Sequence, residues 1–219
     1  MSDLVSRIIS GKFTLIAEIG VNYYDIATQR GISPLEAAKL MCKEAKDVGI
    51  HAVKFQTYKA ETLAAAASPS YWDTSEEPTT SQRELFKKFD SFGEAEYGEL
   101  ANYCKNIGIA FCSTAFDFES ADYLDSMMDV YKISSSDLTN IPFIEYQAAK
   151  GKPIIMSVGA GDLSEMQAAV AAVRRFNDQP LVLMHCVLEY PTPYQDANLR
   201  RITSLKAAFP DVIIGYSDH

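Results

Sequence analysis

The amino-acid sequence predicts an α/β fold of the barrel type. Short apolar runs rich in β-branched residues recur along the 219 residues, and amphipathic stretches separate them. Polar residues stand near the C-terminal end of almost every run. An open doubly wound sheet fits the same alternation, but it builds its site from a few loops. A barrel collects groups from every strand, so we predict a TIM-type (β/α)8 barrel that stops after its seventh strand.

The predicted strands are seven near-continuous apolar runs, a pattern typical of parallel strands that are covered on both faces. They span residues 13–20, 52–57, 110–115, 130–135, 153–159, 181–186 and 212–219. Because a closed barrel of this type needs eight strands, we expect residues 1–219 to form one incomplete barrel domain.

Helices are predicted between the strands. Ser33, Pro34 and Glu36 combine an N-cap, a first-turn proline and a capping-box glutamate, and Gly49 ends this helix. Further helices are predicted over residues 94–107, 118–127, 142–149, 163–176 and 198–209.

The connection 58–93 is far longer than an ordinary loop between a strand and its helix. We call it the excursion. It has two interpretations: a surface loop with a small helix around 81–89, or a lid that closes over a substrate. Long loops at the C-terminal ends of barrel strands are often functional, which favours the lid.

Composition limits the possible partners. The formal net charge is −9 and the isoelectric point is near 4.8, which argues against nucleic acid and anionic membranes as partners. No apolar stretch is long enough to span a bilayer. The four cysteines have no metal-binding spacing and read as reduced thiols, so we expect a cytoplasmic protein.

Two lysines lie inside predicted strands. Lys54, with Gln56 two residues later, and Lys132 should both point into the barrel, where a buried lysine requires an anionic partner. Together they predict a site for a di-anion such as a phosphorylated carboxylic acid. Hydroxyl groups that could complete it are those of Thr114, Ser135, Ser136 and Ser157.

Carboxylates and histidines accompany these lysines. Glu18 either pairs with a lysine or acts as an acid, base or hydroxyl acceptor, and Asp137 either belongs to the site or caps the next helix. His219, at the predicted barrel mouth, is a candidate metal ligand. His185 is better explained as a hydrogen-bonded core residue, and His51 lies at the opposite end.

Seven segments in order along the chain resemble the N-acetylneuraminate (sialic acid) synthase family, which includes legionaminic and pseudaminic acid synthases. They are AEIGVN, VKFQTYKAE, STAFDFES, YKISSSDLTN, GKPIIMSVG, HCVLEYPTP and GYSDH. The resemblance implies a catalytic barrel, and a transferase that condenses phosphoenolpyruvate with an N-acylated hexosamine such as N-acetylmannosamine, releasing phosphate. It also implies a divalent metal, Mn²⁺ or Mg²⁺, and a homodimer. The family's C-terminal antifreeze-like domain is absent from these residues.

The resemblance also implies roles for individual residues. Those expected to hold phosphoenolpyruvate are Lys54, Thr114, Lys132, Ser135, Ser157 and Ser217. Those expected to handle the amino sugar are Gln56, Asp137, Tyr190 and Asp218. Glu18 matches a carboxylate beside the reacting centre, and His219 matches one of two metal-binding histidines.

This sequence departs from the family pattern in its amino-sugar half. Tyr23, Tyr24 and Asp25 stand where the family usually has His-Asn-Gly, Asp137 replaces a glutamate, and Leu188 replaces an asparagine. Two alternatives therefore stay open. One is a Schiff-base aldolase that uses a barrel lysine as nucleophile, and the other is a non-catalytic relative that binds an anion.

Overall fold

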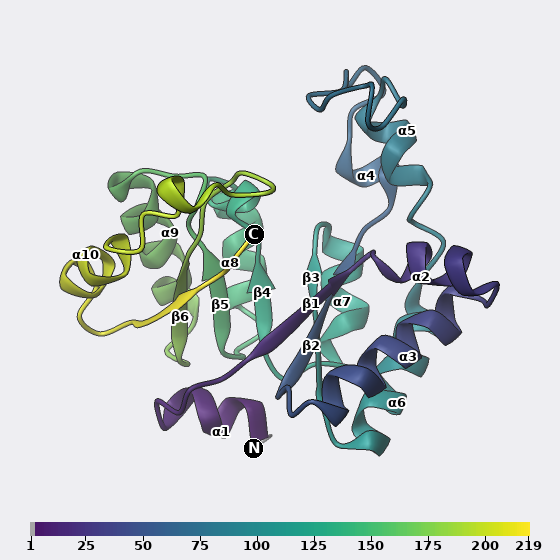
Figure 1. Ribbon diagram of the computed structural model, residues 1–219. Coiled ribbons are helices and arrows are strands. Elements are labelled where there is room, and N and C mark those ends of the chain that lie inside the picture. The colour runs from purple at the N-terminus through teal and green to yellow at the C-terminus, as the bar shows by residue number, and fades with distance from the viewer. Residues whose placement is uncertain (1–2) are drawn as a thin grey trace. The chain divides into compact units, whose positions relative to one another are not determined.

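The computed structural model describes residues 3–219, which divide into two compact units (Figure 1). The first unit runs from Thr14 to Met128. The second comprises Asp129–His219 together with the N-terminal segment that ends at Phe13. In each unit parallel strands alternate with helices, which confirms the predicted α/β class. None of the helices within residues 3–219 has the length and apolarity needed to cross a membrane.

The first unit contains a parallel sheet in the order β1–β2–β3. Its strands are β1 (Ile16–Gly20), β2 (Ala52–Thr57) and β3 (Ala110–Ala115). The register aligns Glu18 with Lys54, and Gln56 with Thr114. Because aligned residues and residues two apart share a face of a sheet, these four side chains lie on one face.

Outside the excursion, the helices of this unit follow the predicted pattern, with one addition. They are α2 (Tyr23–Arg30), α3 (Pro34–Asp47), α6 (Glu94–Ile107) and α7 (Phe118–Asp125). The capping box of α3 is confirmed: the Ser33 hydroxyl accepts a hydrogen bond from the Glu36 backbone N–H, and the Glu36 carboxylate accepts one from the Ser33 N–H. Helix α2 was not predicted, although an acidic residue in its first turn, Arg30 in its last and a left-handed Gly31 favour a helix there.

The excursion, residues 58–93, is tied down at its base and organised within. It holds α4 (Ala60–Leu63) and α5 (Gln82–Lys87), the second of which confirms the predicted small helix. At the base, the Lys59 ammonium donates to the carbonyls of Asp90 and Phe92, both at 2.7 Å.

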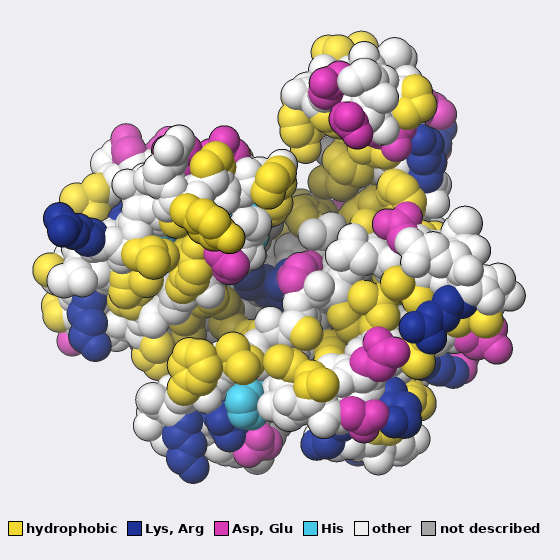
Figure 2. All heavy atoms as spheres, in the orientation of Figure 1, with side chains coloured by type: hydrophobic (Ala, Val, Ile, Leu, Met, Phe, Trp, Pro, Cys, Tyr) yellow, Lys and Arg dark blue, Asp and Glu magenta, His cyan; other side chains and the backbone are white. Residues whose placement is uncertain are grey.

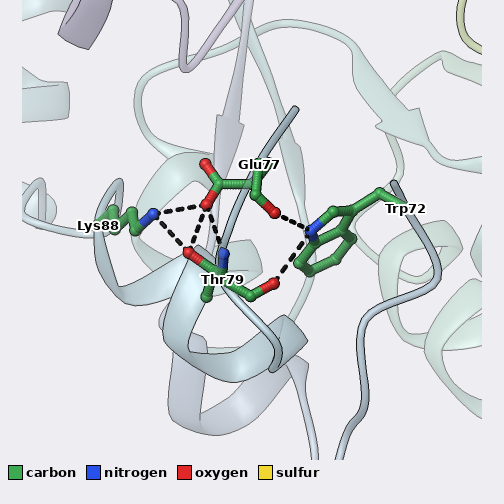
Figure 3. A network of polar contacts seen from close by, with 4 residues as sticks. All are labelled: Trp72, Glu77, Thr79 and Lys88. Carbon is green, nitrogen blue, oxygen red and sulfur yellow. Dashed lines mark hydrogen bonds and ion pairs between the residues drawn. The ribbon is translucent and has the colours of Figure 1, made fainter. Parts of the chain in front are cut away.

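The tip of the excursion has its own polar network (Figure 3). The Trp72 indole N–H donates to the carbonyls of Glu77 (3.0 Å) and Thr79 (3.1 Å). The Glu77 carboxylate accepts from the Thr79 backbone N–H and from the Lys88 ammonium, both within 2.9 Å. These bonds lower the pKa of Glu77 to about 2.

The second unit contains four parallel strands in the order β4–β5–β6–β7. They are β4 (Tyr131–Ile133), β5 (Ile154–Ser157), β6 (Leu181–His185) and β7 (Ile213–Tyr216). The helices are α1 (Asp3–Ile9), α8 (Ile141–Ala148), α9 (Leu163–Phe176) and α10 (Arg201–Ala208). Two short 3₁₀ helices, η1 (Ser135–Asp137) and η2 (Tyr194–Asp196), follow β4 and β6.

Several strands are shorter than the apolar runs that predicted them. The run 130–135 ends as a strand at Ile133 because Ser134, whose hydroxyl accepts from the Ser136 N–H, turns the chain into η1. Similarly, the run 212–219 forms a strand only as far as Tyr216. The polar residues predicted at strand ends therefore lie in the segments that follow these strands.

Candidate functional site

In the first unit the structure brings Lys54 together with Glu18. Their side chains form an ion pair on the shared face of β1 and β2. The Lys54 side chain is 16% exposed, whereas that of Glu18 is 46% exposed. Pairing with a lysine, one of the two possibilities considered for Glu18, is thus the arrangement observed. The ammonium is mostly withdrawn from water and the carboxylate remains accessible.

Gly20 leaves space for the side chains of Glu18 and Gln56 because it has no Cβ. It has a φ of +56° at an irregularity in the pairing of β1 with β2. A Cβ at this position would lie 3.1 Å from Glu18 Oε1 and 3.7 Å from the amide group of Gln56. Gly20 was not among the predicted site residues, although it lies in the segment AEIGVN.

Tyr23 and Tyr24 build an aromatic cluster instead of presenting two polar residues. Tyr23 is fully buried, with its ring centroid 4.6 Å from those of Tyr24 and Phe92. Burial raises the pKa of Tyr23, so its phenol stays neutral. The Tyr24 hydroxyl lies 2.6 Å from the Ser91 hydroxyl and accepts from the Ser91 N–H at 2.9 Å. These tyrosines therefore join α2 to the end of the excursion.

In the second unit Lys132 lies on the same face of the sheet as Ser157. Its ammonium donates to the Ser157 hydroxyl at 2.7 Å and to the Ile133 carbonyl at 2.9 Å. Ser135 follows on η1 and is buried. This arrangement gathers one cationic group and two hydroxyl-bearing residues around the C-terminal ends of β4 and β5.

Asp137 lies in η1. Burial raises the pKa of its carboxyl group, while the hydrogen bond from the Asn140 side chain and the positive charge of Lys132 lower it by less. The interpretation of Asp137 as a cap of the next helix is wrong, because α8 begins after Asn140 and Asp137 lies within η1. A carboxyl group with a raised pKa holds its proton more readily and can donate it to a ligand oxygen.

The segment after β7 is held against the segment after β6. His219 Nδ1 lies 2.7 Å from the Val187 carbonyl oxygen, and the Thr192 N–H donates to the His219 carbonyl at 3.1 Å. The Tyr190 ring stacks on the imidazole, with centroids 4.2 Å apart. Ser217 Oγ lies 3.1 Å from His219 Nε2. The Asp218 carboxylate accepts from the Tyr216 hydroxyl at 2.8 Å.

Exposed hydrophobic side chains gather over the part of this unit that contains β6 and β7 (Figure 2). Between the start of β6 and the end of β7, the large exposed hydrophobic side chains are Leu188, Tyr190, Tyr194, Leu199 and Ile213. Tyr190, which is expected to handle a sugar, is 67% exposed. Leu188 gives this surface an apolar side chain where the family pattern has an asparagine.

The other two histidines do not form ligand sites. His185 is 1% exposed and its Nε2 lies 2.8 Å from the Ala197 carbonyl, as expected for a hydrogen-bonded core residue. His51 Nδ1 accepts from the Leu15 N–H at the N-terminal ends of β1 and β2. Within residues 3–219 no group of three or more His, Cys, Asp or Glu side chains is placed to hold a metal ion. The imidazole of His219 has the donor chemistry that a divalent metal requires.

Comparison with known proteins gives consistent matches. Residues 41–219 match the model of the NeuB family. The chain is 37% identical over 214 residues to N,N'-diacetyllegionaminic acid synthase of Legionella pneumophila, a match that covers 94% of this chain and 57% of that protein. It is 35% identical over 213 residues to the enzyme of the same name from Campylobacter jejuni, with 95% and 61% covered.

A solved structure gives the same result at the level of the fold. Sialic acid synthetase from Leptospira borgpetersenii serovar Hardjo-bovis, crystallised with citrate, matches with a TM-score of 0.78 and 32% identity. The match covers 94% of this chain and 64% of that one. The predicted barrel-type α/β fold is thereby confirmed. The chain spans less than two thirds of the length of each of these three proteins.

Proposed function

Because this chain belongs to the NeuB family, we propose that residues 1–219 form the catalytic barrel domain, as far as its seventh strand, of a nonulosonic (sialic-type) acid synthase. In the proposed reaction, C3 of phosphoenolpyruvate forms a bond to the aldehyde carbon of an open-chain N-acylated hexosamine. Water adds at C2, the bond between C2 and the bridging oxygen breaks, and phosphate leaves with that oxygen. The observation that carries the proposal is the mostly buried ammonium of Lys54 on the polar face of β1–β3.

Phosphoenolpyruvate has a carboxylate and a phosphate, which require cationic and hydroxyl donors. In the first unit, Lys54 and Thr114 have the chemistry to bind these groups. In the second unit, the corresponding donors are Lys132, Ser135, Ser157 and Ser217. Charge-assisted hydrogen bonds from such groups are among the stronger ones in proteins. The Lys54 ammonium is already paired with the Glu18 carboxylate. An entering anion would compete with Glu18 for this ammonium, and the displaced carboxylate would then be available as an acid or base.

The amino sugar would be handled by Gln56, Asp137, Tyr190 and Asp218. Asp137, whose pKa is raised by burial, can hold a proton at its carboxyl group and donate it to a sugar oxygen. His219 would supply a ligand to the divalent metal, Mn²⁺ or Mg²⁺. Such an ion acts as a Lewis acid on a carbonyl oxygen.

The test is phosphate release by the full-length protein, with phosphoenolpyruvate and a panel of N-acylated hexosamines. Phosphoenolpyruvate labelled with ¹⁸O at the bridging position should give labelled phosphate, because the C–O bond breaks. The K54M variant should lose this activity. Absence of release with every sugar, in a protein that still binds the anion, would favour a non-catalytic relative.

The Schiff-base alternative has a distinct signature. An aldolase requires a neutral lysine, and the ion pair with Glu18 favours the charged form of Lys54. Borohydride added with a carbonyl substrate should therefore leave no covalent adduct on Lys54 or Lys132. An adduct on either residue would overturn the proposal in favour of an aldolase.

We also propose that the whole protein is a homodimer in the cytoplasm. The four cysteines are buried thiols, which suits a reducing compartment. Light scattering of the full-length protein tests the dimer.

A further inference from the structure

We propose that Tyr190 is a positioning residue for His219, and that it acts through its ring. Three contacts fix the end of the chain against residues 187–192. The Val187 carbonyl lies 2.7 Å from Nδ1, the Tyr190 ring stacks on the imidazole at an interplanar angle of 24°, and the Thr192 N–H holds the His219 carbonyl. The resemblance to sialic acid synthases assigns Tyr190 to the sugar, so this role is a different one.

The contact with Val187 determines which nitrogen carries the proton. A carbonyl oxygen can only accept a hydrogen bond, so His219 Nδ1 must be the donor. In the neutral ring Nε2 is then an acceptor, and the Ser217 hydroxyl, 3.1 Å away, is placed to donate to it. An imidazole in this form has a lone pair on Nε2. That lone pair can bind a metal ion or accept a proton from a substrate.

The stack determines the orientation of the ring. A hydrogen bond at Nδ1 alone leaves the imidazole able to tilt about the line that joins Nδ1 to the carbonyl oxygen. The Tyr190 ring, with its centroid 4.2 Å away, blocks that tilt on one side. Because a flat ring is sufficient for this contact, the phenol hydroxyl is not required for it.

The first experiment needs neither substrate nor metal. In the full-length protein with ¹⁵N-labelled histidine, long-range ¹H–¹⁵N spectra report the tautomer of His219, which the H219Q variant identifies. Wild type and Y190F should show protonated Nδ1. Y190A and Y190L should show an averaged pair of tautomers, because an imidazole without the ring stacked on its face also swings away from the Val187 carbonyl and loses the bond that fixes the proton on Nδ1. Y194A is the matched control, since Tyr194 is a fully exposed tyrosine four residues along the chain.

The second experiment measures Mn²⁺ binding by electron paramagnetic resonance, and this part rests on the proposed function. Loss of a residue that orients a metal ligand typically lowers metal affinity by about 10- to 100-fold. Y190A and Y190L should show that loss, while Y190F and Y194A should bind Mn²⁺ as wild type does.

The outcomes separate the two proposals. Unchanged His219 spectra in both Y190A and Y190L would overturn the positioning role. So would a Y190F variant that behaves like Y190A, because the hydroxyl would then be responsible. A wild-type protein that binds no Mn²⁺ and releases no phosphate would overturn the proposed function, while the tautomer spectra would still decide the role of Tyr190.

Discussion

At the residue scale, Lys54 and Glu18 form an ion pair but differ in burial, so replacing one of them should change stability more than replacing the other. E18Q removes the carboxylate from an ammonium that is only 16% exposed, whereas K54M leaves a carboxylate that is 46% exposed. We therefore expect E18Q to lower the free energy of unfolding by about 1–2 kcal/mol and K54M by less, because water partly solvates Glu18. Urea denaturation of both variants measures this. A larger loss in K54M would contradict the burial argument.

The order of the two variants should reverse for the binding of phosphoenolpyruvate, where K54M should lose more affinity than E18Q. K54M removes a charge-assisted hydrogen bond to the proposed anion, which is worth about 1.5–3 kcal/mol, or roughly 10- to 100-fold in affinity. E18Q removes a competitor for the ammonium, so it should bind phosphoenolpyruvate at least as tightly as wild type. Calorimetric titration with phosphoenolpyruvate checks the order, and weaker binding by E18Q than by K54M would reverse it.

Gly20 provides a third prediction, with a control in the same unit. G20A places a Cβ 3.1 Å from Glu18 Oε1 at a φ of +56°, so it should both strain the backbone and displace the carboxylate. Gly31 has a φ of +63°, but a Cβ there meets nothing within 4 Å. Both G20A and G31A should cost about 1–2 kcal/mol of stability. Only G20A should reduce phosphate release. Equal rates of phosphate release by G20A and G31A would show that a Cβ at position 20 does not displace the Glu18 carboxylate.

At the scale of elements, the excursion depends on the ionisation of Glu77. Its pKa is about 2 in the folded protein, below the usual 4.5, so the carboxylate form is favoured by folding. The resulting stabilisation is complete above about pH 4.5 and is lost as the pH falls toward 2. Trp72, the single tryptophan of these residues, is bonded to the Glu77 and Thr79 carbonyls and reports this change.

We expect the fluorescence of Trp72 to shift to longer wavelength across that pH range, with W72F providing the background. E77Q should show the shifted spectrum already at pH 7 and little pH dependence, while its far-ultraviolet circular dichroism stays like that of wild type. A wild-type-like spectrum in E77Q at pH 7 would mean that the carboxylate does not hold the tip of the excursion.

The elements also show why sequence could predict some of this fold and not the rest. Apolar runs identified all seven strands within residues 3–219, because each strand is rich in apolar and β-branched residues. They missed α2, whose Tyr23 and Tyr24 were interpreted as departures from a ligand motif. Their actual contacts, with Phe92 and Ser91, are about seventy residues away in sequence, and no local pattern encodes them.

At the scale of the whole molecule, the predicted site residues are divided between the two units. Sequence placed Lys54 and Lys132 on strands with apolar neighbours, and each lies against a polar side chain of the adjacent strand, Glu18 for Lys54 and Ser157 for Lys132. It could not determine that Glu18 would pair with Lys54, or that the Val187 carbonyl would fix the tautomer of His219. Both depend on geometry between segments, which residue type alone does not specify.

The N-terminal helix α1 provides the last prediction. It precedes β1 directly in sequence, yet it groups with residues 129–219, and Leu4, Val5 and Ile8 are buried. L4A should therefore destabilise the second unit by about 2–4 kcal/mol, because Leu4 is only 2% exposed. I9A, on the same helix at 51% exposure, should have little effect.

Hydrogen exchange measured by mass spectrometry distinguishes the two units in these variants. In L4A, amide exchange should accelerate most in β4–β7, because α1 buries its apolar face within the unit that contains those strands. Acceleration confined to β1–β3 would show instead that α1 supports the strand it adjoins in sequence. I9A should match wild type in both sets of strands, which separates the loss of a buried side chain from a general weakening of the helix.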